Sequence, residues 1–73
     1  MAATMNTATF PRTLAMRIRR QLLGISLQSL AQETGLPLLV LRALEQGEYD
    51  PRSLHGVSLK TLEKRLDMTL FRL

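Results

Sequence analysis

The sequence predicts a single all-α domain of four to five short helices, and three observations carry this prediction. Leucine-rich segments repeat at spacings of three and four residues, which is the period of an α-helix. Glycines follow these segments at Gly24, Gly35 and Gly47, where a helix C-cap favours a left-handed residue. The chain has 73 residues and no cysteine, so it is expected to form one domain held by helix packing rather than by disulfides.

The first helix is expected to begin near Phe10, after an uncharged and aperiodic arm over residues 1–9. Pro11 suits the first turn of a helix, where its missing N–H leaves no bond unmade. Leu14, Ile18 and Leu22 follow at intervals of four residues, which places them in one stripe of this helix. Gly24 is expected to end it.

Two more helices are expected between Ser26 and Gly47. Ser26 is placed to cap the second helix by accepting the backbone N–H of Ser29, and Gly35 ends that helix after about two turns. Pro37 suits the start of the third helix, which is expected to run to Gln46.

The last helix is expected after a turn over residues 48–51, where Pro51 pushes the preceding Asp50 out of the α region. Ser58 is the expected cap, and Leu59, Leu62 and Leu66 follow at helical spacing. The predicted domain therefore spans residues 10–66.

The tail over residues 67–73 allows two interpretations. Residues 68–73 alternate with a period of two, which favours a strand, whereas a continued helix is the alternative. A terminal strand in an otherwise helical chain needs a partner, and the same strand of a second copy supplies one. The dimer contacts predicted in this way are Met68, Leu70, Phe71 and Leu73.

The charges favour an anionic partner but are unevenly placed. The net charge is +4, with ten basic and six acidic residues, and residues 33–50 form an acid-rich centre between two basic ends. His55 has no second ligand for a metal, and no arrangement of nucleophile, base and orienting group is visible. No cofactor and no catalysis are therefore expected. The longest apolar run, residues 36–41, is too short to cross a bilayer, so a cytoplasmic protein is expected.

The segment from Gly24 to Pro51 resembles the helix-turn-helix regulators of the Cro and phage-repressor type, often called the XRE family. Twelve positions match that family's pattern in register: Gly24, Ile25, Ser26, Leu30, Ala31, Gly35, Leu36, Leu41, Leu44, Glu45, Gly47 and Pro51. The physics agrees, because a small residue at Ala31 lets two short helices cross closely, while Leu36, Leu41 and Leu44 hold the third helix in the core. The tail is more loosely similar to that of short antitoxins, including the DNA-binding partner of HipA-type kinases.

This resemblance implies a lambda-repressor-like domain, with a helix-turn-helix unit over about residues 26–47, that binds double-stranded operator DNA. In that family the third helix enters the major groove, and neighbouring helix ends contact phosphates. By position, Pro37, Leu38, Leu39, Arg42 and Ala43 would face the groove. The residues implied to contact phosphates are Gln28, Gln46, Arg17 and Arg20. The implied function is a transcriptional regulator, such as an antitoxin or autorepressor of a small operon, with a homodimer and a toxin protein as the implied partners.

The third helix departs from that family's usual polar face. Leu38, Leu39, Val40 and Ala43 stand where family members carry polar residues that read base edges, and only Arg42 is suited to a bidentate contact with guanine. The alternative hypothesis is therefore a protein-interaction module that uses Leu38, Leu39 and Val40 to bind a partner protein or its own dimer mate.

Overall fold

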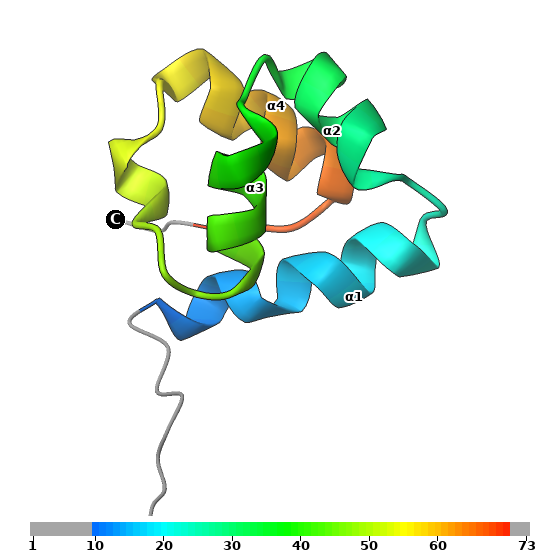
Figure 1. Cartoon of the computed structure of the whole chain (residues 1–73), viewed down its shortest axis with the longest axis horizontal. Coiled ribbons are helices and arrows are strands. Elements are labelled where there is room, and N and C mark those ends of the chain that lie inside the picture. The colour runs from blue at the N-terminus through cyan, green and yellow to red at the C-terminus, as the bar shows by residue number, and fades with distance from the viewer. Residues whose placement is uncertain (1–9, 71–73) are drawn as a thin grey trace, which may run out of the picture.

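A computed structural model of the chain describes residues 10–70, which form four α-helices and two short 3-10 helices in the order shown in Figure 1. The predicted all-α class is confirmed, and residues 10–70 contain no strand. The α1 helix lies along the bottom of Figure 1, α3 runs upright above it, and α2 and α4 occupy the upper part of the view. The elements are η1 (Pro11–Leu14), α1 (Ala15–Leu22), α2 (Leu27–Thr34), α3 (Leu38–Glu45), η2 (Pro51–Ser53) and α4 (Gly56–Leu66).

The turns on both sides of α2 follow the predicted chemistry. Ser26 Oγ accepts the backbone N–H of Ser29 at 3.0 Å, so the predicted N-cap is confirmed. Gly35 has φ +73°, and its N–H donates to the Ala31 carbonyl at 2.9 Å. The chain therefore leaves α2 through a left-handed residue and enters α3 at once.

The core lies where the four α-helices meet. Leu41 and Leu44 of α3 are fully buried, as the sequence predicts, and Leu36 packs against this core from the turn before α3. The other fully or nearly fully buried apolar residues are Met16, Ile25, Leu30, Leu54, Leu62, Leu66 and Leu70. No buried side-chain nitrogen or oxygen in the described part of the chain lacks a hydrogen-bond partner. The hydrogen-bonding needs of the buried polar side chains are therefore met within the domain.

The α1 helix buries the side opposite to the stripe that the sequence analysis identified. Met16 is fully buried, whereas Ile18 is 62% exposed and Leu22 is 78% exposed. Successive residues of a helix are separated by about 100°, so Ile18 and Met16 point to nearly opposite sides of α1. The stripe of Leu14, Ile18 and Leu22 therefore faces solvent along its whole length.

The start of α4 differs from the prediction. The helix begins at Gly56, and Nδ1 of His55 accepts the N–H of Val57 at 3.4 Å, so Ser58 is not the cap. Ser58 Oγ instead donates to the Thr34 carbonyl at 3.0 Å. A hydroxyl that satisfies a terminal carbonyl of another helix ties α4 to the end of α2.

The described part of the tail is a turn and not a strand. Asp67 adopts the left-handed conformation with φ +53°, and Leu70 then returns to the core, where it is almost completely buried. The Leu70 N–H donates to a Glu63 carboxylate oxygen at 2.8 Å, which holds this return. In the single chain, residues 67–70 therefore adopt neither of the two predicted alternatives, the strand or the continued helix, and residues 71–73 lie outside the described part. Nowhere in residues 10–70 does a helix combine the length and hydrophobicity that crossing a bilayer requires.

Candidate nucleic-acid interface

The outward side of α3 carries the candidate binding residues. Leu41 and Leu44 turn into the core, and this places Leu39, Arg42 and the following Gln46 on the exposed side. Leu39 is the extreme case, with 76% of its surface in solvent. A large apolar side chain left in water forgoes about 1.5–3 kcal/mol of burial free energy, so its position suits a contact with a partner.

The other apolar residues of α3 are less available. Leu38 and Ala43 are half-buried, and Val40 packs against the core. Of the three residues in the predicted apolar surface of α3, only Leu39 is therefore well exposed to a partner. Pro37, the N-cap of α3, is exposed beside it.

A surface hollow of about 270 Å³ opens between α1, α3 and the start of α2. It brings together four residues that were predicted to contact DNA from separate parts of the sequence. Arg17 and Arg42 carry its positive charge, and neither forms an ion pair within residues 10–70. The full lining is Arg17, Arg20, Leu27, Arg42, Glu45 and Gln46.

Arg20 holds a structural position at the floor of this hollow. Its Nε donates to Glu45 Oε2 at 2.7 Å, and its Nη2 donates to Glu45 Oε1 at 3.2 Å. A third bond runs from Nη1 to the Ile25 carbonyl at 3.1 Å. The hydrogen bonds to Glu45 raise the pKa of Arg20, and burial opposes this rise. With its donors occupied in this way, Arg20 shapes the hollow, while Arg17 and Arg42 present charge to a ligand.

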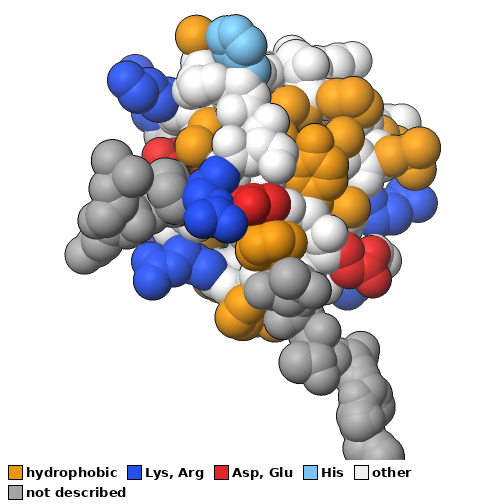
Figure 2. All heavy atoms as spheres, turned by 90° about the vertical axis from the view of Figure 1, so that its left-hand side faces the viewer, with side chains coloured by type: hydrophobic (Ala, Val, Ile, Leu, Met, Phe, Trp, Pro, Cys, Tyr) orange, Lys and Arg blue, Asp and Glu red, His pale blue; other side chains and the backbone are white. Residues whose placement is uncertain are grey.

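The acid-rich centre of the sequence is largely neutralised by arginines. Glu45 is paired with Arg20, and Glu33 accepts from Arg65 Nε at 2.6 Å. Asp50 is paired with Arg52 at 2.9 Å. Figure 2 shows the face on the left-hand side of Figure 1, where hydrophobic, acidic and basic side chains are interspersed. That face is therefore not the uniform basic surface that a phosphate backbone would favour.

The remaining predicted residues are dispersed. Gln28 is exposed in the first turn of α2 and does not line the hollow. Among the predicted dimer contacts, Met68 is half-buried and Leu70 is enclosed by its own chain. Phe71 and Leu73 lie outside the described residues.

Two features of the site were not anticipated. Leu27 lines the hollow at the start of α2, so its exposed part adds apolar surface there. The Arg20–Glu45 pair joins residues 25 positions apart, and no local spacing rule links them.

Comparison with known families adds one finding to this geometry. Residues 15–55, more than half of the chain, match the family model described as a helix-turn-helix domain. The match covers α1, α2, α3 and η2 and stops before α4. No curated protein and no solved structure matches the chain.

Proposed function

Because the chain belongs to the helix-turn-helix domain family, a family of DNA-binding domains, we propose that it is a transcriptional regulator that recognises a specific operator. The single observation that carries this proposal is the hollow in which Arg17 and Arg42 lie beside the exposed face of α3. In this role Arg42 reads a guanine edge in the major groove, and Leu39 contacts a thymine methyl group. Arg17, Gln28 and Gln46 contact the phosphate backbone and set the register.

The finer role is an autorepressor or antitoxin of a small operon in the cytoplasm, acting as a homodimer on a two-fold operator. The register of the Gly24 to Pro51 pattern with Cro and phage-repressor regulators supports this role. A dimer is supported by the presence of a single small domain in the chain. One such domain reads only one half-site, so a two-fold operator needs two copies. A toxin encoded beside the gene is the protein partner that the antitoxin role requires.

The proposed DNA binding is tested with a fragment from upstream of the chain's own gene in a mobility-shift titration. The wild-type chain is expected to bind it more tightly than a random fragment of equal length. Affinity is expected to fall with salt by a logarithmic slope of about 0.9 per neutralised phosphate. Arg42→Ala is expected to lower specific affinity by about 1–3 kcal/mol, because one bidentate base contact is lost.

Lys60→Ala is the matched control, since it removes one exposed positive charge from α4 away from the hollow. It is expected to leave specific affinity nearly unchanged. Equal binding of the specific and random fragments would contradict operator recognition. Equal losses for Arg42→Ala and Lys60→Ala would show that Arg42 acts only through net charge.

The regulatory role has its own test in a reporter strain. The chain is expected to repress its own promoter, and Arg42→Ala is expected to relieve that repression. If the neighbouring reading frame encodes a toxin, co-expression of the chain is expected to restore growth. Repression without such rescue would leave an autorepressor and remove the antitoxin role.

A further inference from the structure

The solvent-facing stripe on α1 is the largest apolar feature that the proposed DNA contacts do not use. Leu14, Ile18 and Leu22 are spaced by four residues and lie one above another on the helix surface. All three are exposed, although α1 already buries Met16 on its opposite side. The helix therefore has two apolar faces, and only one of them is covered by its own domain.

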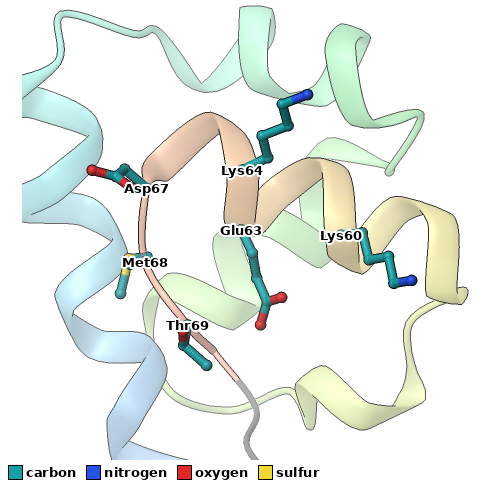
Figure 3. A pocket seen from close by; sticks show the side chains of 6 residues that line it. All are labelled: Lys60, Glu63, Lys64, Asp67, Met68 and Thr69. Carbon is teal, nitrogen blue, oxygen red and sulfur yellow. The ribbon is translucent and has the colours of Figure 1, made fainter.

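The stripe forms one wall of a groove. A hollow of about 210 Å³ is lined by Ala15, Ile18, Arg19 and Leu22 from α1 and by Met68 from the tail. Figure 3 shows the Met68 side chain turned towards α1. A groove between a helix and a methionine fits an amphipathic helix, because the flexible thioether adapts to the side chains it receives.

Positive charge borders this groove. Arg17 and Arg19 flank Ile18 in sequence and therefore project to either side of the stripe. Arg19 Nη2 donates to the Asp67 carbonyl at 3.2 Å, which holds its guanidinium at the edge of the groove. Neither arginine forms an ion pair within the described residues. No acidic residue occurs in residues 1–32 to balance them.

The charges of Arg17 and Arg19 beside the stripe favour some partners for the groove over others. If two copies paired symmetrically through the stripe, each side of one stripe would lie against the equivalent side of the other. Arg17 and Arg19 of one copy would then face the same arginines of the second copy, and the like charges would repel. Met68 stands beside the stripe and gives it a second wall, which suits a narrow helical partner better than a flat bilayer surface. An amphipathic helix with acidic residues beside its apolar stripe satisfies both the shape and the charge.

We propose that the groove lined by Ile18, Leu22 and Met68 is a docking site for an acidic amphipathic helix of a partner protein. The apolar stripe of that helix packs on Ile18 and Leu22. Its flanking carboxylates pair with Arg17 and Arg19. This groove is distinct from the hollow beside α3, which Arg17 lines from the other side of the stripe.

The test uses the full chain and two synthetic helical peptides that share one leucine stripe and differ only in their flanks. One peptide carries glutamates beside the stripe and the other carries lysines. In fluorescence anisotropy, the glutamate peptide is expected to bind at least about tenfold more tightly than the lysine peptide. Arg19→Glu is expected to abolish this preference, because the two flanks of the stripe then carry opposite charges.

Ile18→Gln tests the apolar contact, and Val57→Gln is its matched control because Val57 is equally exposed at the start of α4. Ile18→Gln is expected to lower glutamate-peptide affinity at least about tenfold, and Val57→Gln is expected to leave it unchanged. Thermal melts establish that both variants stay folded.

Three outcomes would overturn the proposal. The first is equal affinity for the two peptides. The second is a dimer in sedimentation that Ile18→Gln dissociates, which would assign the groove to a second copy. The third is Ile18-dependent binding to phosphatidylglycerol vesicles without peptide binding, which would assign it to a membrane surface.

Discussion

Arg20 and Glu45 form a bidentate ion pair that joins the end of α1 to the end of α3. The Arg20 and Glu45 side chains are only 13% and 7% exposed, so both charged groups are largely shielded from water. Such a pair is costly to break, because removing either partner leaves the other charge buried and unpaired. It also fixes the angle at which α3 stands against α1, and with it the shape of the hollow.

We expect Arg20→Ala to lower the free energy of unfolding by about 1–3 kcal/mol, because the part-buried Glu45 carboxylate then loses its hydrogen-bond donors. Replacing both residues, as in Arg20→Met with Glu45→Leu, is expected to recover most or all of that loss, because an apolar pair needs no hydrogen bonds. Urea denaturation of the single and double variants measures both effects in one cycle.

The Glu33–Arg65 pair is the control for this cycle. Its separation of 2.6 Å is similar, but its side chains are 41% and 45% exposed. Arg65→Ala is expected to cost no more than about 1 kcal/mol, since water screens an exposed pair and replaces the lost contact. Similar costs for Arg20→Ala and Arg65→Ala would contradict the assignment of burial as the deciding factor.

The two sides of α1 are expected to respond oppositely to truncation. Met16→Ala removes fully buried volume and is expected to cost about 2–5 kcal/mol of unfolding free energy. Ile18→Ala removes exposed volume and is expected to change stability by no more than about 0.5 kcal/mol. Thermal unfolding followed by circular dichroism compares them directly. A large loss for Ile18→Ala would mean that the stripe is covered in solution.

Gly35 and Gly56 offer a matched pair for backbone strain. An added Cβ would meet no atom within 4 Å at either position, so crowding is not the issue. Gly35 has φ +73°, and Gly35→Ala is therefore expected to cost about 1 kcal/mol or more through the left-handed conformation alone. Gly56 lies in the first turn of α4 without a positive φ, and Gly56→Ala is expected to stabilise by about 0.4–1 kcal/mol. Changes of the same sign in a urea melt would contradict this explanation.

Acid is expected to weaken the turn at η2. The pKa of Asp50 lies below its ordinary value of 3.8, chiefly because the Arg52 side chain donates to its carboxylate, with a further bond from the Arg52 backbone N–H. A lowered pKa in the folded state means that ionised Asp50 favours folding. This contribution is present above pH 3.8 and is lost as the pH falls through the folded-state pKa.

A carboxyl NMR titration checks this expectation. In the Arg52→Gln variant the pKa of Asp50 is expected to rise towards its ordinary value, with the backbone bond keeping part of the shift. An unchanged titration in that variant would rule out the side-chain hydrogen bond as the main cause.

Local chemistry made the α2–α3 segment predictable. The cap at Ser26 and the left-handed Gly35 depend on residues within four positions, and the spacing of Leu41 and Leu44 identified the buried side of α3. The start of α4 was predicted wrongly at Ser58, whereas His55 is the cap in the structure. The long-range bond from Ser58 to the Thr34 carbonyl decided between them.

Long-range contacts also explain what the pattern left open at α1 and in the tail. The spacing of Leu14, Ile18 and Leu22 identified a helical face without deciding what covers it. Contacts far along the sequence determine it: Met16 is buried in the core on the other side of α1, and Arg20 bonds to Glu45 of α3. In the tail, the alternation of residues after Asp67 is compatible with a strand. The hydrogen bond from the Leu70 N–H to the Glu63 carboxylate, which the pattern does not reveal, holds this segment in a turn instead.

The burial of Leu70 has a consequence for how the chain folds during synthesis. Met16 and Leu70 belong to one core cluster, although almost the whole described chain lies between them. The nascent chain can therefore complete this core only after Leu70 has left the ribosomal exit tunnel. Stable packing of the nascent chain waits for Leu70 to emerge, so the domain is expected to close after its helices have formed rather than one helix at a time.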